Sequence, residues 1–474
     1  MFLGMAKPQQ HFDYEVAIVG GGSAGYAAAR TTAAAGLRTV VIEGGEEVGG
    51  LCILRGCMPS KALLYASEVI HLARHASRWG IQARDIGFNF RKVMERKDAL
   101  IKEFADDRTH QLENGAFKFI RANARFVDPD TLVLDSGQTL KARNFIITTG
   151  SIVAPSPLPA LDEVDYLDSD SALRLSRLPR SVIVLGGGSV AVEFGQFFAR
   201  FGVKVTLIQR SAHVLHEMDA DAAAELENAF RREDIELFTN TRLLGARRKA
   251  GSKTVAFHWQ EREIDATAEE IFFALGRIPN TASLGLEKAG VATERGRIIA
   301  NPRMQTNIKR IYAAGDCTGP HEIVHIAVQQ GEVAAHNIVH PQQPREMDYR
   351  LLTEVVFTDP QIATVGLTEK RAVAREIPYL AASYRFNDHG KSLIMEARDG
   401  FVKLLAEPAS GEILGGCCTG PMGGELIHEI IAAMSKRMTV QELAAIPHYH
   451  PTLAEIWTYP AEELAGKTGK RKMS

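Results

Sequence analysis

Two stretches of the chain repeat the same order of apolar and polar positions. In each, a short and almost continuous apolar run leads into a glycine-rich loop, then into a run with helical spacing, then into a second apolar run. Continuous apolar runs of this length are typical of strands buried on both faces of a parallel sheet. The two strand–helix–strand units span Tyr14–Glu43 and Ser181–Gln209, and Gly186 lies 166 residues after Gly20. Two such units predict two dinucleotide-binding domains rather than a solenoid.

The remaining pattern predicts the rest of the fold. Residues 60–79 have helical periodicity, and three prolines between residues 155 and 159 mark a crossover between domains. Buried strands are expected at Glu270–Leu275 and Arg310–Gly315. From Tyr349 onward, short alternating strands are followed by helices, which indicates a separate α+β domain. We therefore expect an α/β protein with two Rossmann-like dinucleotide-binding domains and a C-terminal α+β domain.

Composition excludes several classes of protein. Of 474 residues, 24% are charged and 45% hydrophobic, the usual balance of a globular protein. A net charge of −2 argues against a nucleic-acid binder. Prolines interrupt the longest uncharged stretch and the first residues lack a signal-peptide pattern, so we expect no membrane association and a cytoplasmic location. Five cysteines are too few for a disulfide-stapled secreted framework.

The first glycine loop fits the dinucleotide fingerprint G-x-G-x-x-G. Gly20 permits the tight turn, Gly22 lets a pyrophosphate approach the backbone, and Gly25 allows helix and strand to pack closely. Glu43 ends the second strand, 18 residues after Gly25, where a carboxylate accepts from a ribose hydroxyl. The alternative is an ordinary glycine-rich turn.

The second loop, Gly186-x-Gly188-x-x-Ala191, fits the variant with alanine in third place. Its second strand ends in Gln209-Arg210 rather than in an acid, and an arginine there suits a 2′-phosphate. A surface arginine is the alternative reading of Arg210.

Cys52 and Cys57 are separated by four residues. In a regular helix their Cα atoms would lie roughly 8–9 Å apart, beyond the usual 4.4–6.8 Å of a disulfide. A bond between them would need a distorted segment, for which Gly56 is the natural place. Cys57 would then lie near the start of the next helix, where the helix dipole favours a thiolate. Two structural thiols are the alternative.

His450 precedes a predicted helix and is a candidate general base, with Glu455 as its orienting acid. An ordinary loop histidine is the alternative for His450, and Thr452-x-x-Glu455 is also a capping box. The adjacent Cys417 and Cys418 are expected to be small core residues, and no cysteine–histidine set has zinc spacing.

Together these residues resemble the class I pyridine nucleotide–disulfide oxidoreductases, and within them most closely the dihydrolipoyl dehydrogenases. The resemblance covers nearly the whole chain, and its most specific part is the run Gly-Gly-x-Cys52-x₄-Cys57-x-Pro-Ser-Lys61. The other motifs are the run ending in Thr149-Gly150-Ser151, the crossing Phe273–Asn280 that contains Gly276, the run Ile311–Asp316, Phe357-Thr358-x-Pro360, and His450-Pro451-Thr452-x-x-Glu455.

The resemblance implies a domain order and a set of cofactors. FAD would bind to residues 1–151 and 278–348, with Asp316 reaching the ribityl chain; NADP or NAD would bind to residues 152–277; residues 349–474 would form the interface of a homodimer. Lys61 would sit near the flavin, paired with Glu193.

The resemblance also implies roles for the candidate catalytic residues. Cys52 and Cys57 would form the redox-active pair, with Cys57 next to the flavin and Cys52 exchanging with the substrate sulfur. His450, from the partner subunit, would move the proton. The expected reaction passes electrons between nicotinamide, flavin and a small-molecule or lipoyl-domain disulfide.

Some residues depart from the dihydrolipoyl dehydrogenase pattern. Arg210 and Ala191 resemble NADPH-dependent glutathione reductases, although His216 stands where those enzymes have a second arginine, and Arg55 adds a charge between the cysteines. NADPH-dependent reduction of glutathione or mercuric ion is therefore the alternative function, and a non-catalytic flavoprotein subunit is a further one. The His-Tyr-His-Pro-Thr run and the single Glu455 favour a lipoamide-type substrate.

Overall fold

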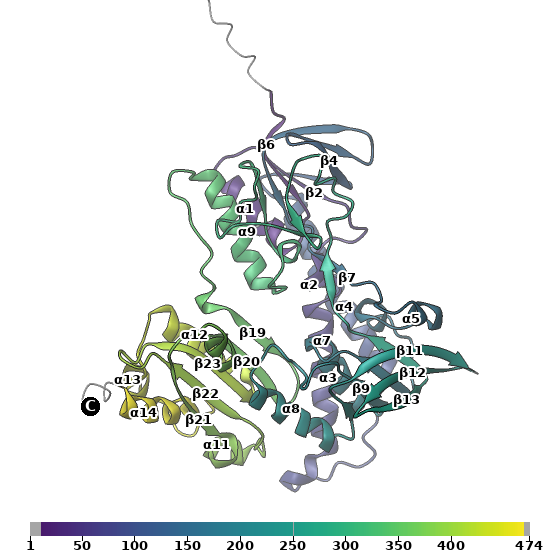
Figure 1. Cartoon of the computed structure of the whole chain (residues 1–474), viewed down its shortest axis with the longest axis vertical. Helices are drawn as coiled ribbons and strands as arrows, with labels where there is room; N and C mark the ends of the chain where they lie inside the picture. Colours follow the sequence, from purple (N-terminus) through teal and green to yellow (C-terminus); the bar gives the residue numbers. More distant parts are fainter. Residues whose placement is uncertain (1–10, 250, 469–474) are drawn as a thin grey trace, which may run out of the picture. The chain divides into compact units, whose positions relative to one another are not determined.

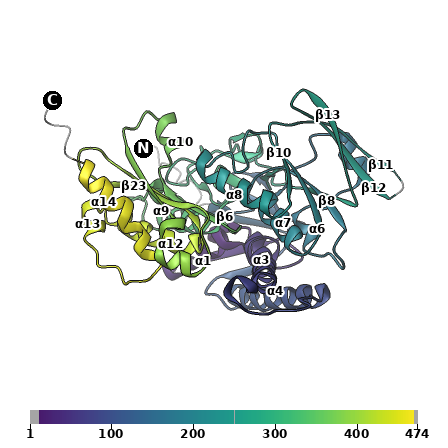
Figure 2. The same ribbon diagram turned by 90° about the horizontal axis from the view of Figure 1, so that it is seen from below.

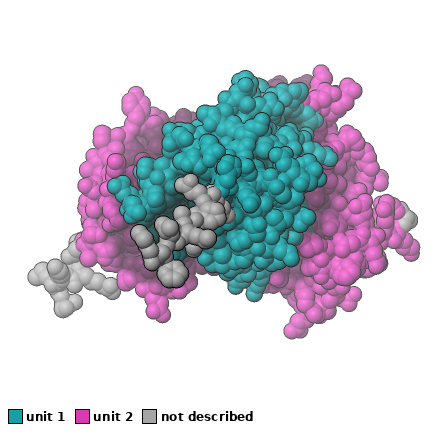
Figure 3. Space-filling model, turned by 90° about the horizontal axis from the view of Figure 1, so that it is seen from above, with its two compact units in different colours: residues 1–59, 96–154, 277–347 teal, residues 60–95, 155–276, 348–474 magenta. Residues whose placement is uncertain are grey.

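The computed structural model describes residues 11–249 and 251–468, which form two compact units (Figures 1 and 3). Unit 1 comprises residues up to 59, 96–154 and 277–347; unit 2 comprises 60–95, 155–276 and 348 onward. Residues 60–95 thus group with unit 2 in the structure. The assignment of the segments 1–151, 152–277, 278–348 and 349–474 to nucleotides and to an interface stays a prediction.

Unit 1 is built on one mixed sheet. Its parallel part has the order β3-β2-β1-β6-β18, and β5 and β4 continue from the first half of β6 as antiparallel strands. The elements of this unit are β1 (Tyr14–Val19), α1 (Ser23–Ala34), β2 (Thr39–Glu43), α2 (Gly50–Leu54), β3 (Lys118–Arg121), β4 (Ala124–Asp128), β5 (Thr131–Leu134), β6 (Thr139–Ile147), β7 (Ser151–Val153), β15 (Arg277–Pro279), β16 (Thr293–Glu294), β17 (Arg297–Ile298), β18 (Ile311–Ala313) and α9 (Val324–Val339). Helices α3 (Cys57–Arg74) and α4 (Phe90–Glu113) run across the unit boundaries.

The central strands of this sheet are apolar because both faces are covered. The last four residues of β1 are buried, as are the first four of β2. Helices α1 and α9 pack against each other beside the sheet, as Figures 1 and 2 both show. Their close crossing requires Gly331, where a Cβ atom would lie 2.3 Å from the carbonyl oxygen of Ala24.

The second strand–helix–strand unit forms a four-stranded parallel sheet in unit 2, with the order β10-β9-β8-β14. The segment of the chain between β10 and β14 forms a separate three-stranded antiparallel sheet, in the order β11-β12-β13. The elements are α5 (Pro159–Val164), α6 (Ser169–Ala172), β8 (Ser181–Leu185), α7 (Ser189–Arg200), β9 (Lys204–Ile208), α8 (Ala220–Arg232), β10 (Glu236–Phe238), β11 (Arg242–Lys249), β12 (Ser252–Trp259), β13 (Arg262–Ala268) and β14 (Glu270–Phe273). Phenylalanines of α7 and β14 stack edge-to-face in its core.

The C-terminal part of unit 2 is an antiparallel sheet in the order β19-β20-β23-β22-β21, next to which Figures 1 and 2 show α12, α13 and α14. Trp457 is fully buried in its core. The elements are β19 (Thr353–Val356), β20 (Gln361–Gly366), α10 (Glu369–Ala374), β21 (Leu380–Arg385), α11 (Gly390–Ile394), β22 (Phe401–Ala406), β23 (Ile413–Gly420), α12 (Gly423–Ser435), α13 (Val440–Ala444) and α14 (Thr458–Lys467).

The observed architecture confirms the predicted fold class: two parallel-sheet folds, each opened by a glycine loop, and a C-terminal α+β fold. Among the residues described, none belongs to a helix with the length and apolar character that crossing a bilayer requires.

Candidate functional site

The first glycine loop is shaped by close contacts that only glycine permits. Gly20 follows β1 with φ +110°, and a Cβ atom there would lie 2.4 Å from the carbonyl oxygen of Thr148. A Cβ atom on Gly25 would lie 1.9 Å from the carbonyl oxygen of Gly20. Gly22 caps α1 without a side-chain hydrogen bond, and the first turn of α1 carries no acid. The first amides of α1 are therefore open to an anion, as pyrophosphate binding requires.

The other candidates of unit 1 surround this loop at one edge of the sheet. Glu43 ends β2 and accepts hydrogen bonds from the backbone N–H groups of Gly21 and Gly45, both at 2.7 Å. Gly150, with φ +69°, follows β6, and Asp316 follows β18. Parallel strands bring their carboxyl ends to the same edge, where doubly wound folds bind ligands. The residues fit a dinucleotide bound across this edge.

Asp316 is held by a short chain of hydrogen bonds. The Ser151 hydroxyl donates to Oδ2 of Asp316 at 2.8 Å, and Nε of Arg277 donates to that hydroxyl oxygen at 2.9 Å. The Arg277 guanidinium also donates to the carbonyl oxygen of Ser151 at 2.9 Å. This chain fixes the carboxylate at the edge of the sheet, where a polyol hydroxyl would find an oriented acceptor.

The second glycine loop repeats the first, with one difference at its third position. Gly186 follows β8 with φ +112°, and a Cβ atom there would lie 2.4 Å from the carbonyl oxygen of Ala274. Gly188 caps α7, and a Cβ atom on it would have no neighbour within 4 Å, so no contact within the described protein requires glycine there. Ala191 holds the third position of this loop and is fully buried, whereas a Cβ atom at the third position of the first loop, Gly25, would clash with the backbone. Gly276, with φ +123°, follows β14 in the sequence.

The structure adds a residue that sequence reasoning passed over, Gln209. A Cβ atom on Gly187 would lie 2.8 Å from the Gln209 carboxamide carbon, just as one on Gly21 would contact the Glu43 carboxylate. Gln209 therefore occupies in the second domain the place of Glu43 in the first. The sequence could have shown this, because the shift of 166 residues that relates Gly20 to Gly186 also relates Glu43 to Gln209. Arg210 is the next residue and is exposed. Within the described chain its guanidinium makes no ion pair or hydrogen bond, while its backbone N–H donates to Gln209 Oε1 at 2.9 Å.

The Cys52–Cys57 segment is distorted at the expected place. Helix α2 ends at Leu54, and α3 begins at Cys57. Gly56 passes close to the preceding turn, since a Cβ atom there would lie 3.0 Å from the carbonyl oxygen of Leu51. Both cysteines are half-buried. Cys57 heads an 18-residue helix, whose dipole stabilises a thiolate at that end.

Lys61 and Glu193 lie together in unit 2. Lys61 Nζ is 2.9 Å from Oε2 of Glu193 and 3.1 Å from Oε1. The Glu193 carboxylate is buried and also accepts from the backbone N–H of Phe357 at 2.9 Å. The ammonium lies 4.7 Å from the centre of the Phe357 ring. Because both its salt bridge and the ring hold it, Lys61 has a fixed position.

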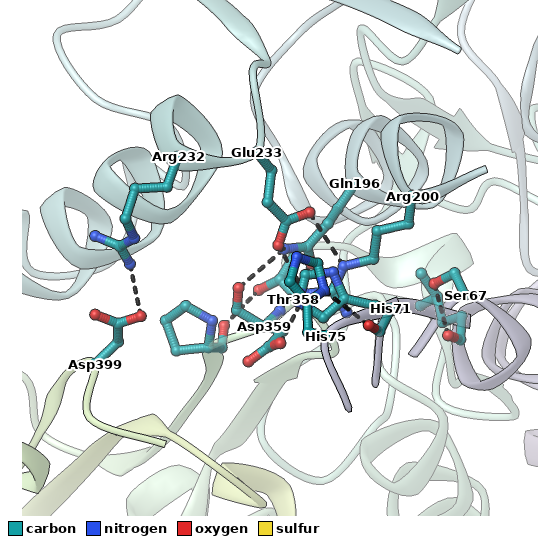
Figure 4. A network of polar contacts seen from close by, with 12 residues as sticks. Ser67, His71, His75, Gln196, Arg200, Arg232, Glu233, Thr358, Asp359 and Asp399 are labelled. Atoms are coloured by element: carbon teal, nitrogen blue, oxygen red, sulfur yellow. Dashed lines mark hydrogen bonds and ion pairs between the residues drawn. The ribbon is translucent and has the colours of Figure 1, made fainter. Parts of the chain in front are cut away.

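Helix α7 also binds the segment Phe357–Asp359 through Gln196 and Arg200 (Figure 4). Gln196 donates to the carbonyl oxygen of Asp359 at 2.9 Å and accepts from its backbone N–H at 2.8 Å. The Arg200 guanidinium contacts Asp359 Oδ2 and Glu233 Oε1, both at 2.7 Å. His71 faces this cluster, where burial and the Arg200 charge lower its pKa to about 4. Arg200 forms ion pairs with both carboxylates, so we interpret the cluster of His71, Glu233 and Asp359 as a structural ion-pair network.

His450 and Glu455 form a hydrogen-bonded dyad. His450 Nδ1 is 2.9 Å from Oε2 of Glu455; the imidazole is 77% exposed in the single chain, and the carboxylate is buried. The Glu455 backbone N–H donates to the Thr452 hydroxyl at 3.4 Å, which is half of the expected capping box. The carboxylate turns to His450 instead of completing that box. A carboxylate at Nδ1 fixes the tautomer in which Nε2 is free to accept a proton.

The remaining cysteines are buried thiols. Burial raises the pKa of Cys317 and of Cys417 to about 12, and raises that of Cys418 well above its ordinary value. Cys417 and Cys418 are neighbours on β23 and belong to two different hydrophobic clusters, as residues on opposite faces of a strand do. They serve as small core residues.

Comparison with known proteins places the whole chain. Residues 14–331 match the pyridine nucleotide-disulphide oxidoreductase family, and residues 352–461 match its dimerisation domain. A dihydrolipoyl dehydrogenase of Geobacillus stearothermophilus is 34% identical over 95% of this chain and 96% of its own. A mercuric reductase of Streptomyces lividans is 34% identical over 98% of both chains. The structure of LpdA from Mycobacterium tuberculosis superposes with a TM-score of 0.85 at 28% identity, covering 95% of this chain and 99% of that one.

These matches confirm the family, the enzyme class and the cofactors predicted from the sequence, FAD and a pyridine nucleotide. They agree with two glycine loops at the carboxyl edges of two parallel sheets and with a separate C-terminal fold. The chain belongs to the pyridine nucleotide-disulphide oxidoreductase family and is an FAD-dependent disulfide oxidoreductase.

Proposed function

We propose that this enzyme is of the dihydrolipoyl dehydrogenase type and exchanges electrons between a nicotinamide coenzyme and a small dithiol–disulfide substrate through Cys52 and Cys57. The observation that carries the proposal is the His450–Glu455 dyad, with 2.9 Å between Nδ1 and Oε2. A dithiol substrate must lose a proton before it can act as a nucleophile, and an oriented imidazole supplies the acceptor. Several relatives carry the name dihydrolipoyl dehydrogenase.

The chain's own residues account for the thiol chemistry. His450 Nε2 takes the proton of one substrate thiol, and the thiolate attacks Cys52 Sγ in a Cys52–Cys57 disulfide. Cys57 leaves as a thiolate, which the start of α3 stabilises. The sulfur of the second substrate thiol then attacks the substrate sulfur of the mixed disulfide, and its proton passes to Cys52, which leaves as a thiol. Bound FAD supplies two-electron chemistry that connects this thiol pair with the nicotinamide.

A homodimer completes this proposal. The dimerisation domain supports a second copy of the chain as the partner. On α3, Tyr65, Val69 and Leu72 form an exposed apolar stripe at helical spacing, and Tyr449 beside His450 is 83% exposed. Such apolar surface is typical of an interface between protein chains. We expect His450 to serve the cysteines of the partner, which agrees with its exposure in the single chain.

Reduction of mercuric ion with NADPH is the second candidate. The Streptomyces relative named mercuric reductase is as similar as the dihydrolipoyl dehydrogenases and covers nearly the whole chain. Thiolates bind soft metal ions strongly, so the same cysteine pair suits either substrate. The dyad favours the dithiol, because reducing a metal ion requires no base for a substrate thiol.

Turnover of the purified holoenzyme with lipoamide, oxidised glutathione and Hg²⁺, each with NADH and NADPH, tests the proposal. We expect lipoamide to give the highest kcat/KM. His450→Ala should lower the disulfide half-reaction about 10²–10⁴-fold, the worth of a general base, and leave flavin reduction by the coenzyme nearly unchanged. His448→Ala is the matched control, since His448 also pairs with a glutamate, Glu429, at 2.6 Å. Hg²⁺ as the best substrate, or equal losses in both variants, would contradict the proposal.

A further inference from the structure

Glu455 has a second histidine neighbour, His389. Nε2 of His389 lies 3.4 Å from Oε1 of Glu455, while Oε2 of the same carboxylate faces His450. His389 is fully buried and precedes α11 as its capping residue. Within the described chain Nε2 has no well-aligned hydrogen-bond partner, and its contact with Oε1 is an ion-pair distance rather than a short hydrogen bond. The carboxylate therefore lies between an exposed imidazole and a buried one.

Ser392 decides which nitrogen of His389 carries the proton. Its hydroxyl lies 2.8 Å from Nδ1, and the serine is fully buried. If Nδ1 donated to the hydroxyl, the lone pair of Nε2 would face the carboxylate in a buried site, at a cost in free energy. If the hydroxyl donates to Nδ1, Nε2 carries the proton and faces Oε1 at 3.4 Å, so that both contacts are attractive. The geometry selects the second tautomer.

The surroundings of His389 keep the ring neutral. Phe386 and Tyr459 stand edge-on to it, with ring centres 6.4 Å away. The charged groups that act on it are Glu455 and, more weakly, His450. Burial lowers the pKa of His389 despite the opposing carboxylate. A neutral ring that donates through Nε2 stabilises the Glu455 anion. Because the ring carries no positive charge, it does not compete with a protonated His450 for the carboxylate.

We propose that His389 is a positioning residue for the disulfide half-reaction: its Nε2–H holds Oε1 of Glu455 so that Oε2 stays on Nδ1 of His450. This inference rests on the proposed function, in which His450 moves the substrate proton. A carboxylate held at one oxygen only is free to turn about its Cγ–Cδ bond. With both oxygens held, the plane of the carboxylate is fixed, and so is the imidazole that it orients.

Three variants of the FAD-loaded enzyme test this role. His389→Leu removes the donor and keeps a buried side chain; we expect the disulfide half-reaction to slow about 5–15-fold, near the lower end of the roughly 10–150-fold that a hydrogen bond to a charged group is worth, because the contact is long and acts through Glu455. The pH–rate profile of the disulfide half-reaction should move to higher pH, because a carboxylate that loses a donor is a stronger acceptor. His389→Gln returns an N–H near the same point and should recover to within about threefold. His428→Leu removes a histidine of the same fold whose Nδ1 bonds only to the carbonyl oxygen of Gly424, and should change nothing.

The readouts separate positioning from folding. FAD content, melting temperature and flavin reduction by the coenzyme should match in all variants. A His389→Leu enzyme that is folded but shows an unchanged rate and pH profile, or a profile moved to lower pH, would overturn the proposal. So would a His389→Gln enzyme that recovers nothing while its FAD content is normal.

A measurement independent of turnover tests the tautomer. In ¹⁵N-histidine spectra of the holoenzyme, we expect the signal lost in His389→Gln to show an unprotonated Nδ1 and a protonated Nε2. Ser392→Ala should let the other tautomer appear. A protonated Nδ1 in the unmodified enzyme would overturn the proposal.

The control for the proposed function is His450→Ala. If that variant keeps its disulfide half-reaction, the proposed function fails. If it loses the half-reaction and His389→Leu does not slow, only the role of His389 fails.

Discussion

We predict that two adjacent residues at the end of β9 decide the choice of coenzyme. In the first domain Glu43 offers a carboxylate beside its glycine loop, and in the second Gln209 offers a neutral carboxamide at the corresponding place. The amide does not repel a 2′-phosphate, and the exposed Arg210 can bind one. We predict that the unmodified enzyme prefers NADPH, that Arg210→Gln abolishes the preference, and that Gln209→Glu reverses it.

The structure sets the size of the effect. A hydrogen bond to a charged group is worth about 1.5–3 kcal/mol, which corresponds to roughly 10–150-fold in kcat/KM. Arg210 is exposed, so solvent screens its charge and the lower part of that range applies. Arg210→Gln should therefore reduce kcat/KM for NADPH about 10–30-fold and leave that for NADH within about twofold. In Gln209→Glu a carboxylate oxygen replaces the amide group that donates to the carbonyl of His213 at 3.3 Å. That oxygen should turn to the ribose hydroxyls of NADH instead.

The assay is flavin reduction by each coenzyme under anaerobic stopped-flow conditions at two ionic strengths. The NADPH advantage should shrink at the higher ionic strength, because it rests on charge. Arg248→Gln is the control, as Arg248 is another exposed arginine of unit 2. An unmodified enzyme that prefers NADH, or an Arg210→Gln enzyme whose ratio equals that of the control, would refute the reasoning and assign NAD as the coenzyme.

Three further outcomes are expected. Cys52→Ser should leave a Cys57 thiolate beside the flavin and show long-wavelength charge-transfer absorbance in the oxidised enzyme, whereas Cys57→Ser should not; the same spectrum in both variants would contradict the assignment. Gly25→Ala should purify with little FAD, because its Cβ atom would lie 1.9 Å from a carbonyl oxygen, while Gly188→Ala, whose Cβ atom meets open space in the protein, should retain FAD and weaken only coenzyme binding; the FAD absorbance of the two purified proteins decides. The three buried cysteines, whose raised pKa values keep them protonated, should resist a thiol reagent at pH 8 until the reduced enzyme is unfolded, and rapid modification of more than two thiols would contradict their burial.

Local patterns were sufficient to predict much of the fold. Both strand–helix–strand units follow from continuous apolar runs bounded by glycine, because a buried parallel strand tolerates few polar residues. The helix break before Cys57 also followed from local geometry, since Gly56 is the residue between the cysteines that can approach the preceding turn closely. The dyad of His450 and Glu455 spans five residues and was within reach for the same reason.

Contacts between distant residues were out of reach. His389 precedes Glu455 by 66 residues, and no periodicity links a capping residue of α11 to a 3₁₀ helix near the end of the chain. At the end of β9, the sequence shows both Gln209 and Arg210, but only the path of the backbone decides which side chain turns toward the glycine loop. Burial and direction of a side chain are set by packing partners, which one sequence does not name.

Helix α7 connects several parts of unit 2 that a sequence pattern treats separately. Its first turn follows Gly188 and leaves its amides open for the coenzyme phosphates, while one face presents Glu193, Gln196 and Arg200 at a spacing of three and four residues. Those side chains hold the segment Phe357–Asp359 of the C-terminal fold through backbone and side-chain bonds. Glu193 also holds Lys61 of α3, the helix that starts with Cys57. Because a buried ion pair that loses one partner costs about 3–5 kcal/mol, a displacement of α7 would be felt at Lys61 and at the dimerisation fold together. Helix α7 is thus the element of unit 2 that holds Lys61 and the segment Phe357–Asp359 in place together.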